Sequence, residues 1–398
     1  MRGRIRMVRK MVFLALAMFS LGTDLFVIGG VLPKLAQGLS VSAAAAGQLV
    51  TVFAVTYAVT APFLSAMAGK YPRKPVMIGA ITGFALANLG SAFAVNFAML
   101  LGMRVLAALC AATFSPSLPA TAAQLAPAER RGAALAIVNG GLPAALVAGA
   151  PLGTWIGQVF GWRWSFLLVF ALTITAAVSL WLTLPQLPRA ETALVRRKLS
   201  FAVTPAYRGG WAVSLGWIIA TYELQTYLPQ ILSSLLKMDA ERTSLVLLMN
   251  GIASVVGIVL GGLFADRWKP VSTIRYALLL MAASFLIMPF AVHSAIGFTA
   301  VVLLWGIGHW GFYPSQQHQL VSPRPTEAGT ILAFNSSVVY FGQAIGAGLG
   351  GLVYASGGSG IEIAWISAGA ALLALAATKT KLYITKNGGM KHDDSIAA

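Results

Sequence analysis

The chain has 398 residues, of which 58% are hydrophobic and 10% are charged, and its formal net charge is +17. Soluble domains carry about 25% charged residues, so this composition excludes an ordinary soluble protein and predicts a chain that crosses a membrane many times. The positive charge alone would also fit nucleic-acid binding, so the positions of the basic residues must decide between the two.

Apolar stretches of about 20 residues, the length that crosses a bilayer as a helix, follow one another along most of the chain. In the first half they cover residues 11–33, 45–68, 75–95, 97–123, 132–158 and 164–185. In the second half they cover residues 209–236, 243–265, 273–292, 296–318, 327–354 and 360–383. The first stretch has about 22 residues and further spans follow it, so it is read as a retained helix rather than a secretory signal.

We therefore expect an all-α integral membrane protein with 12 transmembrane helices in two pseudo-symmetric six-helix halves, residues 11–185 and 208–383. The other segments are a basic N-terminus (1–10), a linker rich in Pro and basic residues (186–207) and a tail (384–398). Helices fit these continuous apolar stretches, whereas the strands of a membrane barrel would alternate apolar and polar residues.

Parts of the first half return in the second half at a constant offset of about 200 residues. The segment Gly132–Ala136 returns as Gly329–Ala333, and the same offset carries Gly149 onto Gly346. Parallel repeats of this size are typical of transporters whose two halves rock about a central site.

The basic residues give an orientation, because Lys and Arg accumulate in the cytoplasmic loops of membrane proteins. With the N-terminus in the cytoplasm, most of the 28 Lys and Arg residues lie on that side. The exceptions are Lys34, Arg163, Lys237 and Arg242 in outer loops and Arg104 within a span. Both termini are therefore expected in the cytoplasm of a bacterial cell, and topology explains the net charge without a nucleic-acid partner.

Three ionisable residues, Asp24, Arg104 and Glu223, lie deep in the expected spans, where a charge is costly and so marks function. At about 1.5 Å per residue, Asp24 and Arg104 lie at similar depths, roughly 12–15 Å below the outer surface. The two side chains could meet across the first and fourth spans. If Arg104 moves relative to Asp24, the proton affinity of the carboxylate changes, which would couple transport to protons. A fixed ion pair that only holds two helices together is the alternative.

Glu223 lies near the expected midplane of the seventh span, and no basic residue of its half lies at that depth. It could take up a proton or bind a cationic or hydroxyl-rich substrate. Alternatively, it is hydrogen-bonded to neighbouring Tyr or Gln side chains and serves packing.

Further polar and aromatic side chains lie at mid-helix depths and could line a central cavity with Glu223. Any one of them more often serves packing, but together they fit a site where rings hold an organic molecule and polar groups orient it. These residues are Tyr57, Asn139, Tyr222, Gln225, Tyr227, Trp305, His309, Asn335 and Tyr340.

Small residues and one proline in the fifth and eleventh spans indicate close helix packing and bending. Gly149 and Gly153 flank Pro151, which removes a helix hydrogen bond, and Gly346 and Gly350 follow the same four-residue spacing. These glycines could serve the conformational change, or they could serve static packing alone.

These residues together resemble the drug:proton antiporter branch of the major facilitator superfamily, over residues 11–383. Gly149–Gly153, followed by Gly161-Trp162-Arg163, looks like the antiporter motif in helix five of that family. Arg104, in Leu101-Gly102-Met103-Arg104, matches the helix-four arginine associated with proton coupling, although Ala107 and Ala108 stand where the family has Gln and Gly. The resemblance implies a major-facilitator-type fold. Gly22-Thr23-Asp24 also looks like efflux carriers of this branch for sugars, purines or antibiotics.

The loop after the second span departs from the family pattern Gly-x-x-x-Asp-Arg-x-Gly-Arg-Arg. It keeps Lys70, Arg73 and Lys74, whereas the acid survives only in the second copy, as Asp266 before Arg267. In the family this loop latches the cytoplasmic gate, so the resemblance implies gating roles for these five residues.

We predict a secondary transporter, monomeric in the lipid bilayer, that exports a drug-like, purine-like or sugar-like molecule in exchange for protons by alternating access. No cofactor or metal is expected. A proton-independent facilitator is the closest alternative. An intramembrane enzyme is a weaker alternative, because the serine loop at Gly357–Gly360 is followed only by His392 as a base, and a phosphate-binding loop is missing.

Overall fold

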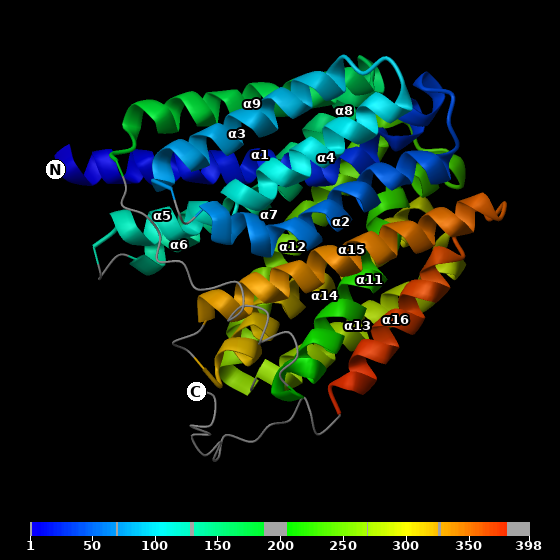
Figure 1. The fold of residues 1–398 in the computed structure, drawn as a ribbon. Helices are drawn as coiled ribbons and strands as arrows, with labels where there is room; N and C mark the ends of the chain where they lie inside the picture. The colour runs from blue at the N-terminus through cyan, green and yellow to red at the C-terminus, as the bar shows by residue number, and fades with distance from the viewer. Residues whose placement is uncertain are drawn as a thin grey trace.

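The computed structural model describes residues 2–68, 71–127, 131–186, 205–268, 270–324 and 328–379, and its regular elements are helices (Figure 1). The first half contains α1 (Arg2–Gly38), α2 (Ala43–Ala68), α3 (Arg73–Ala92), α4 (Phe97–Phe114), α5 (Ser117–Leu125), α6 (Arg131–Asn139), α7 (Gly141–Ala144), the π-helical turn η2 (Ala145–Gly149), α8 (Ala150–Val159) and α9 (Trp162–Thr183). The second half contains α11 (Pro205–Ser234), α12 (Ala240–Trp268), α13 (Pro270–Ala291), α14 (Ala295–Val321), α15 (Ala328–Ala355) and α16 (Ile363–Ala377).

Within the described ranges, 10 helical stretches are long and apolar enough to cross a membrane. Two further helices, α11 and the shorter α16, occupy the positions of the expected seventh and twelfth spans. The all-α membrane architecture in two halves is confirmed, and the count of twelve spans stays a prediction.

Several helices differ from the expected stretches in length or continuity. α1 begins at Arg2 and α11 at Pro205, so part of the predicted basic N-terminus and the end of the predicted linker are helical. The rest of the linker (187–204) and the tail lie outside the described residues. The fourth span is split into α4 and α5 at Ser115 and Pro116.

The fifth span widens into the π-helical turn η2 just before Pro151. Proline has no N–H and its ring clashes with the carbonyl four residues earlier, here that of Val147. A local π-helical turn moves this carbonyl away from the ring. The bend expected from Pro151 therefore takes the form of a widened turn.

The glycines of the two repeats pack in equivalent ways on the first helix of their own half. A side chain on Gly149 would meet Thr23 of α1, and one on Gly153 would meet Val27. In the second half, a side chain on Gly346 would lie 2.8 Å from the carbonyl oxygen of Ile219 in α11. The close packing predicted from the glycine spacing is present, and it repeats between the halves.

The first and second halves lie side by side, the first above the second in Figure 1. We call the end of the bundle where α1 and α11 begin the basic end, because exposed Arg9 and Arg208 lie there. α2 runs along α15, α1 contacts α11, and α12 contacts η2 and α8. These contacts between the halves keep the elements of the central site together.

Three glycines bring the halves together in the middle of the bundle and toward the end opposite the basic end. A side chain on Gly29 of α1 would lie 2.9 Å from the carbonyl oxygen of Thr226 in α11. Gly47 of α2 faces the Tyr227 hydroxyl, and Gly251 of α12 lies against the backbone of Leu146. We refer to Gly29, Gly47 and Gly251 as the inter-half glycines.

Candidate functional site: a buried ion pair beside a tyrosine cluster

Asp24 of α1 and Arg104 of α4 form an ion pair inside the first half. Arg104 Nη1 donates to both carboxylate oxygens of Asp24 at 2.8 Å. Asp24 is 0% and Arg104 1% exposed, so both charges are removed from water and lipid. Removing one partner of such a buried pair costs about 3–5 kcal/mol, because the other charge is left without compensation. The meeting of these two side chains, expected from their depths, is present.

Aromatic rings connect this ion pair to the second half. Phe53 of α2 lies 4.5 Å from the Arg104 guanidinium, measured to the ring centroid, and stacks on Tyr57 one turn further along α2. The Tyr57 ring in turn stacks on Tyr340 of α15, with 3.7 Å between centroids. A movement of α2 against α15 would therefore change the surroundings of Arg104 through two rings.

Four tyrosines from four helices meet beside Asp24. Tyr340 stacks on Tyr57, and Tyr222 of α11, Tyr313 of α14 and Asp24 lie close enough for a charge on any of them to act on its hydroxyl. The Tyr57 hydroxyl shares a 2.7 Å hydrogen bond with Ser115, at the break between α4 and α5. We call Tyr57, Tyr222, Tyr313 and Tyr340 the tyrosine cluster. Its flat rings and phenol groups can hold an aromatic or hydroxylated molecule.

His309 of α14 lies in an aromatic stack with α11. Its ring is 4.6 Å from that of Trp217, nearly parallel, and its Nδ1 shares a 2.8 Å hydrogen bond with the Thr221 hydroxyl. The Trp217 indole donates to the His309 carbonyl. With only 6% of its surface exposed, His309 joins α11 to α14 in this conformation.

Asn335 belongs to a hydrogen-bonded network near the basic end of the second half. Its Oδ1 accepts a 2.8 Å hydrogen bond from Ser214 of α11, and Ser214 accepts one from Gln316 of α14. Gln316 also donates to the Gly210 carbonyl. This network connects α11, α14 and α15, and Asn335 is 4% exposed.

Glu223 lies between α11, α15 and α16, and it is fully buried. Its Oε2 accepts a 3.3 Å hydrogen bond from Ser367 of α16, while its Oε1 has no partner among the described residues. Gly346 and Gly350 of α15 pack on the backbone around it. The structure thus places this carboxyl group inside the second half, without a basic partner in the part of the chain described.

The other expected cavity residues lie at packing, interface or exposed positions. Trp305 is 1% exposed and packs on Phe285 of α13. Tyr227 is fully buried, faces Gly47 of the first half and donates to the Ala347 carbonyl. Gln225 is half-buried and Asn139 is exposed. In this conformation these side chains do not join the tyrosine cluster.

The basic residues after α2 make contacts within the first half. Arg73 donates to the Gln124 side chain at 3.0 Å, and Lys74 donates to the Leu184 carbonyl. Lys70 and the side chain of Asp266 lie outside what the structure describes, and Arg267 is exposed. The gating roles of these five residues therefore stay predictions.

Sequence reasoning missed Tyr313, Trp217 and Thr221. Tyr313 is one of several aromatic residues on α14, and the sequence holds no signal that separates it from its neighbours. Thr221 could have been found, because the repeat offset that carries Gly149 onto Gly346 also carries Asp24 onto Thr221. Among the described residues, no group of three or more His, Cys, Asp or Glu could hold a metal ion.

The sequence model of the Major Facilitator Superfamily matches residues 14–346. The chain is 30% identical to the uncharacterized MFS-type transporter YbcL of Bacillus subtilis, over 93% of this chain and 94% of that protein. It is 32% identical to a chloramphenicol resistance protein of Streptomyces lividans, over 66% of this chain and 68% of that protein.

The fold is similar to that of a bacterial homologue of the human lysosomal transporter Spinster, solved in an inward-facing and unoccupied conformation. The TM-score is 0.73 and the sequence identity is 18%, with 96% of this chain and 99% of that chain covered. At this identity the likeness concerns the fold alone.

Proposed function

Because the chain belongs to the major facilitator superfamily, and is thus a membrane transporter rather than an enzyme, we propose that it exports a small organic molecule in exchange for protons. Alternating access of the two halves carries the molecule across the membrane. The basic end faces the cytoplasm of a bacterial cell, where Lys and Arg accumulate.

One observation carries the proposal: a fully buried carboxylate and guanidinium, 2.8 Å apart, lie beside a tyrosine cluster that joins both halves. An ion pair favours the ionised carboxylate, and separation of the pair favours its protonation. When the halves tilt, Phe53 and Tyr57 move with α2 and change the position of Arg104. Asp24 then loads a proton in one state and releases it in the other.

The inter-half glycines support an inward-facing state for the present conformation. They hold the halves together in the middle and toward the end opposite the basic end, where the pathway would be closed to the outside.

The tyrosine cluster favours a molecule with an aromatic ring and polar substituents. Tyrosine rings stack on flat molecules and their hydroxyls exchange hydrogen bonds with them. The charges of Asp24 and Arg104, which lie beside the cluster, compensate each other. An uncharged aromatic drug fits this chemistry, and the relative named for chloramphenicol resistance is in line with such a cargo. Purine-like and sugar-like molecules remain further candidates.

The proposal is tested in two steps. A growth-protection screen of antibiotics, purine analogues and sugar analogues, in a host lacking its own drug exporters, selects a transported compound. The labelled compound is then added to inverted membrane vesicles energised by respiration. We expect accumulation above the outside concentration, and loss of that accumulation when a protonophore is added. A facilitator would only equilibrate the compound, so equal concentrations in energised vesicles would contradict proton exchange.

Replacing Tyr340 with Ala is expected to raise the KM for transport by about tenfold. The change removes a ring of the tyrosine cluster on which the cargo would stack, and one aromatic contact contributes about 0.5–1.5 kcal/mol, of which the upper end corresponds to about tenfold in affinity. Tyr340→Phe keeps the ring and is expected to stay within about threefold of the wild type. Initial rates in vesicles give both values, and an unchanged KM in Tyr340→Ala would remove the cluster from the substrate site.

Replacing Glu223 with Gln is expected to leave proton-driven accumulation at more than about half of the wild-type level. The amide oxygen can accept the hydrogen bond from Ser367, and the residue lies inside the second half rather than in the tyrosine cluster. Loss of accumulation at normal protein levels would instead make Glu223 a second proton carrier.

A further inference from the structure

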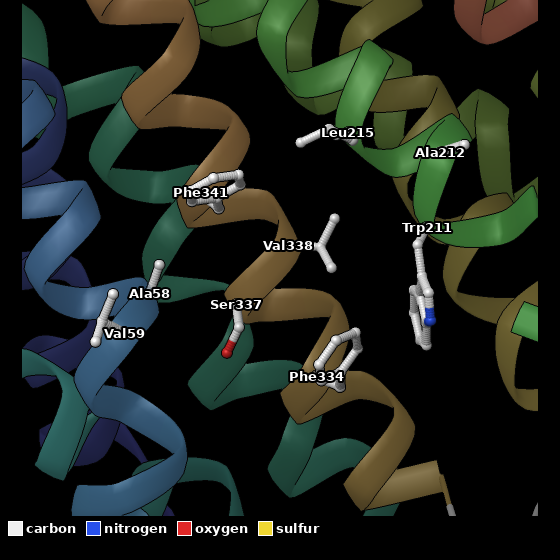
Figure 2. Close-up of a pocket in the computed structure, with 9 residues that line it drawn as sticks. All are labelled: Ala58, Val59, Trp211, Ala212, Leu215, Phe334, Ser337, Val338 and Phe341. Atoms are coloured by element: carbon white, nitrogen blue, oxygen red, sulfur yellow. The ribbon is translucent and has the colours of Figure 1, made fainter. Parts of the chain in front are cut away.

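A cavity of about 370 Å³ opens on the side of the bundle, between α2, α11 and α15 (Figure 2). It lies in the part of the bundle nearer the basic end, because its residues on α11 and α15 come soon after these helices begin. Figure 2 shows Trp211 of α11 facing Phe334 and Val338 of α15 across the cavity. The volume lies within the range of about 300–1,000 Å³ that is usual for ligand sites.

The mouth of this cavity opens to the lipid side of the bundle. Val59 is 56% and Phe341 50% exposed, and Ala212 of α11, on the other side of the cavity, is exposed as well. Val59 belongs to a row of exposed apolar residues on α2 that recurs every four residues. The row consists of Val55, Val59, Phe63 and Met67. An apolar row on one face of a spanning helix contacts acyl chains, so the cavity is open to the bilayer.

The chemistry along the cavity matches that of a phospholipid, with a positive charge at the level of the headgroup and apolar surface at the level of the acyl chains. Arg208 is exposed and lies one helical turn before Ala212, on the same face of α11 and toward the basic end. Trp211 and Ser337 line the cavity, but their polar atoms Nε1 and Oγ are buried, so the wall of the cavity is apolar at this level. Leu215 and Phe341, further from the basic end, are apolar. A charge near the basic end and apolar surface beyond it thus follow one another along α11, from Arg208 to Leu215.

We propose that this cavity binds an anionic phospholipid from the leaflet at the basic end. Arg208 pairs with the phosphate, and an acyl chain fills the space beside Val338 and Phe341. Basic residues beside pockets between spanning helices are known to select anionic headgroups. The site is independent of the direction and coupling of transport.

Binding of the lipid is tested by native mass spectrometry of the full chain after its release from nanodiscs. The nanodiscs contain equal amounts of phosphatidylglycerol and phosphatidylethanolamine with the same acyl chains. We expect the wild type to retain phosphatidylglycerol preferentially. Arg208→Gln is expected to lower this preference about fivefold, the factor that one basic residue contributes at an anionic surface. Arg208→Lys is expected to keep it.

Two matched variants separate the site from general lipid contact. Arg9→Gln removes another exposed basic residue at the basic end and is expected to change nothing. Ala212→Trp fills the mouth of the cavity and is expected to remove the retained lipid. The proposal is overturned if the wild type shows no preference, if Arg208→Gln keeps it, or if the folded Ala212→Trp protein retains the lipid. Glycerol phosphate, which lacks acyl chains, should not displace the retained phosphatidylglycerol. Displacement by glycerol phosphate would show a simple anion site and contradict the proposal.

Discussion

Asp24→Asn is expected to abolish accumulation of the cargo in energised vesicles while leaving exchange of labelled for unlabelled cargo. Asn keeps the shape of the side chain and can accept a hydrogen bond from Arg104, but it can neither carry the charge nor take up the proton. Loss of the partner of a buried guanidinium also costs about 3–5 kcal/mol of stability. Accumulation, exchange and thermal unfolding are measured on the same preparations.

The variants at Arg104 separate coupling from stability. Arg104→Gln is expected to lower stability as much as Asp24→Asn does, because it leaves a buried carboxylate at the position now paired at 2.8 Å. The double variant Asp24→Asn/Arg104→Gln holds no buried charge at this site, so we expect it to regain stability without regaining accumulation. Recovery of accumulation in the double variant would show that the pair only holds α1 and α4 together.

Gly251→Ala is expected to separate the two halves at the end of the bundle opposite the basic end. The added methyl group would lie 2.7 Å from the carbonyl carbon of Leu146, a backbone atom that cannot rotate away. Overpacking of this kind costs about 1–3 kcal/mol, which shifts an equilibrium by about tenfold or more. Spin labels at exposed Gln37 and Arg242, in a background without Cys110, report the distance between the halves. We expect a larger share of long distances than in the wild type.

Two glycines of the same helix serve as controls for this prediction. Gly262 has no atom within 4 Å of an added side chain, so Gly262→Ala should leave both distance and stability unchanged. Gly257 packs on the Ile307 backbone within the second half, so Gly257→Ala should lower thermal stability without lengthening the distance. Equal distances in Gly251→Ala and Gly262→Ala would show that the α12 contact with η2 does not control the opening.

The sequence predicted what depends on depth and on spacing. Counting residues along two apolar spans placed Asp24 and Arg104 at one level, and the structure joins them directly. The glycine spacing likewise predicted close helix packing in both halves, and the structure shows these glycines packed on α1 and α11. Both predictions need only the rise of the helix and the period of the repeat.

The faces of the helices could not be predicted, because membrane-spanning helices are apolar all round and their hydrophobic pattern marks no inner side. Trp305 and Tyr340 were equally good candidates for the cavity, yet one packs on Phe285 and the other joins the tyrosine cluster. Depth placed Glu223 near the midplane, but only its contact with Ser367 shows which neighbours it faces. The lipid-side cavity was also hidden, since it requires three helices that are distant in sequence.

The two halves are not mechanically equal, although they repeat one another. The first half contains the α4–α5 break and the widened turn before Pro151, whereas the corresponding α14 and α15 run without interruption. Interrupted helices lose backbone hydrogen bonds at the break and bend there most readily. The transport cycle should therefore be asymmetric, because the first half can bend at two interruptions that α14 and α15 do not share.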